Sequence, residues 1–229
     1  MPIDRARTAL GQVFFQRCFY LFAGVLALIT AVLMVEPTTR GRILINGLNV
    51  LLDVAAVAAV GRSRLSFLVA FALAAPTLWF QLRAIDEGDA SHLLVSWSFG
   101  AALYAVTIAY LLRYVFQREV MTADKLYGAA AGYLMLGALW AYLYAIADYL
   151  QPGSFVSGGA AVTPSVSDLV YFSFTTLTST GFGDFVPTHR WARGLCVLEQ
   201  LIGALFVAIL IARLSGVYPP RQAIREQSR

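Results

Sequence analysis

Charged residues are scarce in this chain. Of its 229 residues only 13% are charged, whereas 59% are apolar. An ordinary soluble domain has about 25% charged and about 45–50% apolar residues. Because a water-soluble fold of this size could not bury so much apolar surface, the composition excludes an ordinary soluble domain. It indicates a multi-pass protein of the cell membrane, in contact with the lipid bilayer.

The residues and motifs of catalysis are also few. The two cysteines, Cys18 and Cys196, both lie in apolar runs and are interpreted as buried apolar residues, not as a disulfide or a metal site. The chain has no G-x-S-x-G and no H-E-x-x-H, and His92 and His189 lie in predicted loops. We therefore expect no enzyme and no organic cofactor. The net charge of +4 is interpreted as a topology signal, so we expect no nucleic-acid partner.

Long apolar segments are abundant instead. A helix needs roughly 20 apolar residues to cross the hydrocarbon core. If every such segment crosses, a cytoplasmic N-terminus places most Arg and Lys residues in the cytoplasm, together with the C-terminus. The expected fold is an all-α membrane protein with six transmembrane helices, at 14–35, 43–60, 65–82, 93–116, 126–148 and 194–213.

The connection between the last two segments contains a predicted short helix. Residues 151–164 are rich in Gly, Ser and Pro and predict an exposed loop. Ser165 and Asp168 then match a capping box before the apolar run 169–177. This run is too short to span the bilayer. A helix that ends inside the bilayer is tolerated only where the backbone after it lines a water-filled path, so we expect a re-entrant helix.

The strongest motif of the chain follows this run, as Thr-Ser-Thr-Gly-Phe-Gly-Asp at residues 178–184. This motif resembles the T-V-G-Y-G selectivity filter of the potassium channel family, and the resemblance covers about residues 126–214. Glycines one residue apart allow the positive φ angles that aim successive carbonyls at one axis. The resemblance implies a homotetramer in which the carbonyls of Ser179, Thr180, Gly181 and Phe182 bind K+. The filter residues are Thr178, Ser179, Thr180, Gly181, Phe182, Gly183 and Asp184.

Two departures from the family pattern concern selectivity. Ser179 and Thr180 stand where Thr and Val are common, and Phe182 replaces the more common Tyr. The alternative function is therefore a poorly selective channel for monovalent cations with the same fold. A secondary transporter is disfavoured, because it would need interrupted helices in corresponding halves and only one interruption is present.

The resemblance also predicts residues that support the filter and line a cavity. The Tyr171 hydroxyl is expected to donate to Asp184, and Thr175 is expected to support the filter. Gly203 is predicted to be a hinge of the last helix, with close helix packing as the alternative. An apolar cavity wall that closes by dewetting is expected on the helix face shared by Ala204, Val207 and Ile211.

Glu199 is an acid inside the last apolar segment, where a charge is costly. On a helix it lies about 140° from Ala204, so it is expected to point away from the cavity. We predict that it supports the filter from behind. Its expected donors are hydroxyls of the re-entrant helix, at Ser173, Thr175, Thr176 or Thr178.

The first four apolar segments lack the arginine ladder of a voltage sensor. Segment 93–116 carries only Arg113, near its end, and Arg118 follows. One charge crossing the whole field is worth about 2.3 kcal/mol per 100 mV, so weak voltage dependence is expected. Asp53, an acid inside the second segment, is interpreted as a structural contact of a cation such as Arg113 or as a protonated acid, with a functional role as the alternative. The expected domains are a cytoplasmic segment at 1–17, a four-helix domain at 18–117, a pore domain at 126–214 and a cytoplasmic tail at 215–229.

Overall fold

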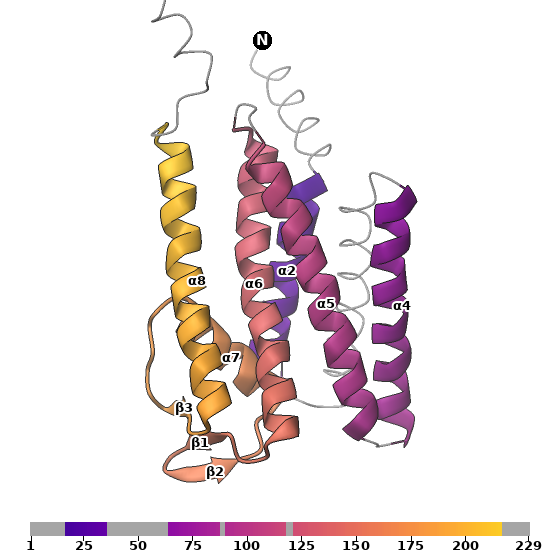
Figure 1. Cartoon of the computed structure of the whole chain (residues 1–229), viewed down its shortest axis with the longest axis vertical. Helices are drawn as coiled ribbons and strands as arrows, with labels where there is room; N and C mark the ends of the chain where they lie inside the picture. The colour runs from indigo at the N-terminus through magenta and orange to yellow at the C-terminus, as the bar shows by residue number, and fades with distance from the viewer. Residues whose placement is uncertain (1–16, 36–63, 88–89, 118–120, 217–229) are drawn as a thin grey trace, which may run out of the picture.

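The computed structural model describes residues 17–35, 64–87, 90–117 and 121–216. These residues form long helices, one short helix and three short strands (Figure 1). The long helices are α2 (Arg17–Met34), α4 (Arg64–Glu87), α5 (Ala90–Val115), α6 (Ala123–Leu150) and α8 (Arg190–Leu214), and the short helix is α7 (Val166–Leu177). The strands are β1 (Phe155–Ser157), β2 (Ala160–Val162) and β3 (Phe185–Pro187).

The long helices fit the dimensions of a membrane. By length and composition α4, α5, α6 and α8 can each cross one, and α2 contains a shorter apolar run. These helices coincide with five of the predicted segments, so the membrane character of the chain is supported. The remaining predicted segment, 43–60, lies outside the described residues, as does Asp53 within it.

Helix α8 extends beyond the predicted apolar segment 194–213. It begins at Arg190, so Arg190 and Arg193 lie in its first turns. Hydropathy detects only the part of a helix that lies in hydrocarbon. The first turn of α8 follows His189, whose backbone is extended. Because this turn is polar, the hydropathy pattern assigned it to the connection.

Helix α6 organises the bundle. Helices α2 and α5 pack against one side of it, and α7 and α8 pack against the other parts of its surface (Figure 1). Helix α4 packs on α5, and α2 also contacts α7. The main apolar core is shared by α2, α5, α6, α7 and the strands. Helices α2 and α5 therefore support α6 directly, and α2 also supports α7.

The end of the bundle at which α6 begins is joined by polar contacts. The carboxylate of Asp124, in the first turn of α6, accepts from the Cys18 amide at 3.1 Å and from the Tyr114 hydroxyl at 2.8 Å. Near the last turn of α8, Arg213 donates to the carbonyl of Gln117 at 2.7 Å. These contacts connect α2, α5, α6 and α8 at one end of the molecule.

The described chain is mostly helical, and one connection contains a small sheet. Residues 151–164, predicted as an exposed loop, contain β1 and β2, which form an antiparallel sheet with β3 in the order β2-β1-β3. Gly158 and Gly159 form the turn, with φ of 59° and 85°. Phe155 is fully buried and stacks on Phe185, with ring centroids 5.1 Å apart. The sheet therefore joins this connection to the residues directly after Asp184.

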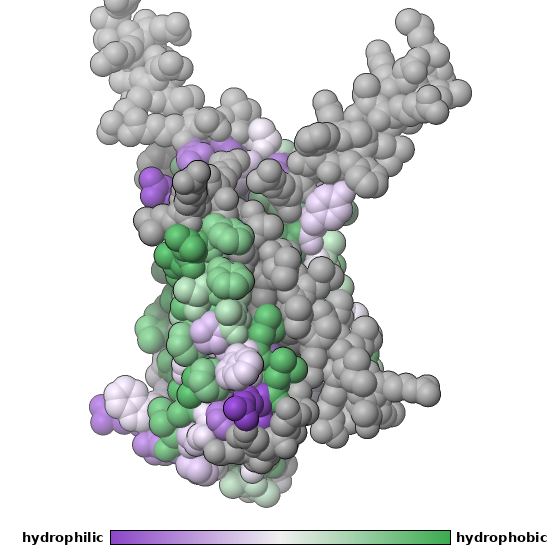
Figure 2. Space-filling view, turned by 90° about the vertical axis from the view of Figure 1, so that its right-hand side faces the viewer, coloured by the Kyte–Doolittle hydropathy of each residue, from purple (hydrophilic) through white to green (hydrophobic). Residues whose placement is uncertain are grey.

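Much of the helical surface is apolar. Figure 2 shows the side on which α4 lies, with apolar residues at mid-height and more polar ones toward the ends. Exposed side chains on α4 include Phe67, Phe71 and Trp79. On α8 the exposed fractions of Leu201, Leu205 and Ile209 are 55%, 58% and 52%. Both surfaces suit contact with lipid or with other apolar helices.

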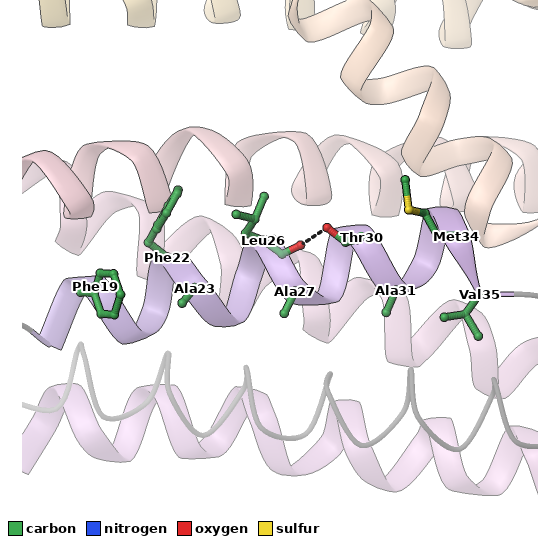
Figure 3. Close-up of a pocket in the computed structure, with 9 residues that line it drawn as sticks. All are labelled: Phe19, Phe22, Ala23, Leu26, Ala27, Thr30, Ala31, Met34 and Val35. Atoms are coloured by element: carbon green, nitrogen blue, oxygen red, sulfur yellow. Dashed lines mark hydrogen bonds between the residues drawn. The ribbon is translucent and has the colours of Figure 1, made fainter.

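An open groove of about 600 Å³ runs along α2 (Figure 3). Among the described lining residues only Thr30 has a hydroxyl, and it donates to the Leu26 carbonyl of its own helix at 2.8 Å. The lining residues are Phe19, Phe22, Ala23, Leu26, Ala27, Thr30, Ala31, Met34 and Val35.

Candidate functional site

Helix α7 begins as the sequence predicts. The Asp168 amide donates to the Ser165 hydroxyl at 3.2 Å, and the Ser165 amide donates to the Asp168 carboxylate at 2.9 Å. This reciprocal capping box is confirmed. With 12 residues, α7 is about 18 Å long, well short of the roughly 30 Å of a hydrocarbon core.

The segment 178–184, directly after α7, alternates in backbone conformation. Ser179, Gly181 and Gly183 have φ of 56°, 53° and 76°. Glycine adopts these angles without steric penalty. Ser179 is the one residue other than glycine with positive φ among the described residues, and that conformation costs about 1–2 kcal/mol. The surrounding contacts must therefore hold the segment in this shape.

The hydrogen bonds of this segment fix the direction of its carbonyl groups. The amides of Thr180 and Gly181 both donate to the Thr175 carbonyl, at 2.8 and 3.1 Å. In a trans peptide the carbonyl points opposite to the N–H of the next residue, and no cis bond occurs among the described residues. The carbonyls of Ser179 and Thr180 therefore point away from α7. Successive oxygens of this kind can replace the water around a cation.

Thr175, predicted as a supporting residue, contacts the segment through its backbone. Its carbonyl accepts the two amides described above, whereas its hydroxyl donates to the Phe172 carbonyl at 2.9 Å within α7. Between Thr178 and Thr180 the hydroxyl oxygens lie 2.9 Å apart. The start of the segment is thus held mainly by the last turn of α7.

The segment is uncovered in the single chain. Residues 178–184 are all exposed, and Phe182 has an exposed fraction of 69%. The residues on either side, Leu177 and Phe185, are buried. One chain therefore anchors both ends of the segment and leaves its carbonyl row open.

The outer end of the segment is held by Tyr171. Its hydroxyl donates to the Asp184 carboxylate at 2.9 Å, which is the contact that the sequence predicts. This hydrogen bond raises the pKa of the Tyr171 phenol above its ordinary value. The Tyr171 ring also stacks on Phe182, with centroids 6.3 Å apart and planes 4° apart. The amide of Phe185 donates to the same carboxylate at 3.0 Å.

Glu199 lies behind α7, fully buried. One carboxyl oxygen lies 2.5 Å from the Ser173 hydroxyl, so the predicted contact with α7 is present, and its role stays a prediction. The other oxygen accepts from the Tyr144 hydroxyl at 2.5 Å. The sequence analysis missed Tyr144, because nothing in the local pattern of α6 distinguishes this Tyr from other aromatic residues of an apolar helix. The Thr176 hydroxyl lies instead 4.0 Å from the Cys196 sulfur.

Gly203 lies where α8 comes closest to the end of α7. A Cβ at this position would lie 2.5 Å from the Leu177 carbonyl oxygen and 2.8 Å from a Leu177 methyl carbon. That carbonyl also accepts from the Tyr133 hydroxyl at 3.3 Å. The geometry favours the packing interpretation of this glycine, whereas the hinge remains a prediction.

The predicted cavity residues lie on a different face of α8 from Glu199 and Gly203. Ala204 is exposed, and the exposed fractions of Val207 and Ile211 are 40% and 56%. Glu199 and Gly203 are one turn apart and buried. Helix α8 therefore has one face against α7 and an apolar face that nothing in the described chain covers.

Comparison with known proteins gives a match to one family model over part of the chain. Residues 130–218 match the model of a family described as ion channel. The match covers most of α6, all of α7, the segment 178–184 and α8, and it points to a transport protein and not to an enzyme. No significant match was found among curated proteins or among solved structures.

Proposed function

We propose that the chain is one subunit of a homotetrameric, potassium-selective channel of the cell membrane, with both termini in the cytoplasm. The observation that carries the proposal is the segment 178–184, with left-handed backbone at Ser179, Gly181 and Gly183 and carbonyls directed away from α7. The family match supports the function of an ion channel. The carbonyl row supports the choice of a cation as the permeant ion.

The proposed ion sites are formed by backbone oxygens. Carbonyls of Ser179, Thr180, Gly181 and Phe182 would replace the hydration shell of K+, with the Ser179 hydroxyl at the inner mouth. The C-terminal end of α7, which carries a partial negative charge, would favour a cation waiting below. Asp184, held by Tyr171, would fix the outer end of the row.

Four copies are proposed because one chain supplies one carbonyl row. The exposed segment and the uncovered face of α8 with Ala204, Val207 and Ile211 would both face a central axis. In this arrangement residues 126–214 form the pore domain and 18–117 form a supporting domain. Current would depend weakly on voltage, since Arg113 lies at the end of α5.

The second candidate is a channel of the same fold that also passes sodium. Phe182 favours it, because this ring is largely exposed and has no hydroxyl to bind the surroundings of the segment. The Phe182 ring contributes stacking on Tyr171 and no hydrogen bond of its own, so the Tyr171–Asp184 contact is the hydrogen bond that braces this end. A weaker brace allows a wider range of segment shapes and hence weaker discrimination between ions.

The proposal is tested by Gly181→Ala, with Gly194→Ala as the matched control. A Cβ at either glycine meets no atom within 4 Å, but Gly181 has φ of 53° and Gly194 is an ordinary helical residue. Strain of about 1–2 kcal/mol therefore arises only at Gly181. In liposome flux assays Gly181→Ala should lose the preference for potassium over sodium, whereas Gly194→Ala keeps it. An unchanged preference in Gly181→Ala would exclude this segment as the filter.

A further inference from the structure

The hydroxyl of Ser173 has two short contacts and one proton. Its oxygen lies 2.7 Å from the Gly137 carbonyl oxygen and 2.5 Å from a carboxyl oxygen of Glu199. A hydroxyl supplies a single donor, and a backbone carbonyl can only accept. The contact with Gly137 therefore uses the Ser173 proton. The contact with Glu199 needs a second proton, which Ser173 does not have.

An ionised Glu199 does not satisfy this geometry. If the Ser173 proton pointed to a carboxylate, the Ser173 and Gly137 oxygens would face each other at 2.7 Å without a hydrogen between them. A shared proton would lengthen both contacts, and both are short. A carboxylic acid, in contrast, has one O–H donor and one carbonyl acceptor. Its acceptor oxygen suits the Tyr144 hydroxyl at 2.5 Å.

Among the residues that the structure describes, Glu199 has no compensating positive charge beside it. The titratable groups near it are Tyr133 and Tyr144 on α6 and Cys196 on α8, all of which are ordinarily uncharged at neutral pH. Its partners on α7 and α6 are hydroxyls, and no Lys, Arg or His pairs with it in the part of the chain that the structure describes. A fully buried carboxylate without a cation is costly.

We propose that Glu199 is a proton-binding site whose carboxyl group donates a hydrogen bond to Ser173. Ser173 donates in turn to the Gly137 carbonyl, and Tyr144 donates to the second carboxyl oxygen of Glu199. This chain of hydrogen bonds joins α8 to α7 and α7 to α6. The bound proton thus completes the contact that positions α7, and with it the segment 178–184.

Helices α6 and α7 also approach each other closely at the Ser173–Gly137 contact. A Cβ at Gly137 would lie 2.7 Å from the Phe174 ring, so a larger residue there would require this ring to move near the place where Ser173 reaches the Gly137 carbonyl. Glycine, serine and glutamate from three helices therefore meet at one point. The inference concerns the protonation of Glu199 and holds for any permeant ion.

Infrared spectroscopy of the full chain in lipid bilayers tests the proposal. At neutral pH the parent should show the C=O stretch of a protonated carboxyl group, shifted to lower frequency in D2O, and Glu199→Gln should lose this band. In Ser173→Ala the band should remain but move to higher frequency, because the carboxyl proton loses its acceptor. Ser167→Ala, on the same helix and hydrogen-bonded to Ser165, should leave the band unchanged.

Two results would overturn the proposal. One is a parent spectrum without a protonated-carboxyl band that depends on Glu199. The other is a band that Ser173→Ala does not shift. This second result is decisive if Glu199→Gln fails to assemble. Ion flux measured on the same samples separates this inference from the proposed function. A band without potassium flux contradicts only the channel, and flux without the band contradicts only the proton site.

Discussion

Gly203 and Gly181 show two different uses of glycine in one site. At Gly181 the requirement is a positive φ with open space around it, whereas at Gly203 it is the close approach of the Leu177 backbone. The sequence alone did not distinguish a hinge from close packing at Gly203, because both uses need the same residue. The deciding neighbour, Leu177, belongs to another helix.

Gly203→Ala should therefore destabilise the protein. Its Cβ would lie 2.5 Å from a backbone oxygen, which cannot rotate away as a side chain would, so α8 must move from α7. Overpacking of this kind costs about 1–3 kcal/mol. Thermal unfolding of the purified protein in detergent should show a lower midpoint than the parent, while Gly194→Ala stays near the parent value. Equal midpoints for both variants would contradict the packing role.

Contacts between nearby residues were the predictable part of the site. The Ser165–Asp168 cap follows from a spacing of three, and the resemblance to a known family placed Tyr171 against Asp184. Tyr144 was missed, since its partner Glu199 is 55 positions away and on another helix. The direction of the hydrogen bond at Ser173 needed a count of protons and acceptors that only coordinates allow.

At the scale of elements, the helices were predictable and the sheet was not. Apolar runs of membrane length rarely occur outside membrane-spanning helices, so α4, α5 and α6 agree with their predicted segments within a few residues. The strands have three residues each, and β1 pairs with β3 about 30 positions later. Such short strands leave no periodicity, and their pairing depends on burial of Phe155.

The sheet should influence the segment 178–184. Phe155 packs between Phe185, which directly follows Asp184, and Phe172 of α7, with centroids 5.1 and 5.5 Å away. Phe155→Ala should remove about 3–5 kcal/mol of stability and speed the loss of current during sustained conduction. Val156→Ala, on the other face of β1, should have a much smaller effect. Current decay that is equal in both variants would show that the sheet does not support the segment.

Helix α5 should not respond to voltage. Arg113 is exposed in its last turn and would cross little of the membrane field. We expect a shallow dependence of open probability on voltage in planar bilayers, unchanged in Arg113→Gln. A steep activation curve that shifts in Arg113→Gln would contradict this account of the front helices.

At the scale of the whole molecule, the single chain is incomplete. In α8 only Ala192, Glu199 and Gly203 are buried, and the carbonyl row of 178–184 is open. Contact with lipid accounts for an apolar helix surface, but it does not account for exposed backbone oxygens, which lipid cannot solvate. In the proposed tetramer, further copies of the chain around a water-filled axis would cover both surfaces.

Potassium selectivity of the proposed pore is measured by the reversal potential of its current. The purified protein is reconstituted in planar bilayers with potassium on one side and sodium on the other at equal concentration. A potassium-selective pore gives a reversal potential far from zero. Its sign is set by the flow of potassium out of the compartment that contains it. A reversal potential near zero would contradict potassium selectivity and favour the poorly selective channel, and the absence of any current would contradict the pore itself.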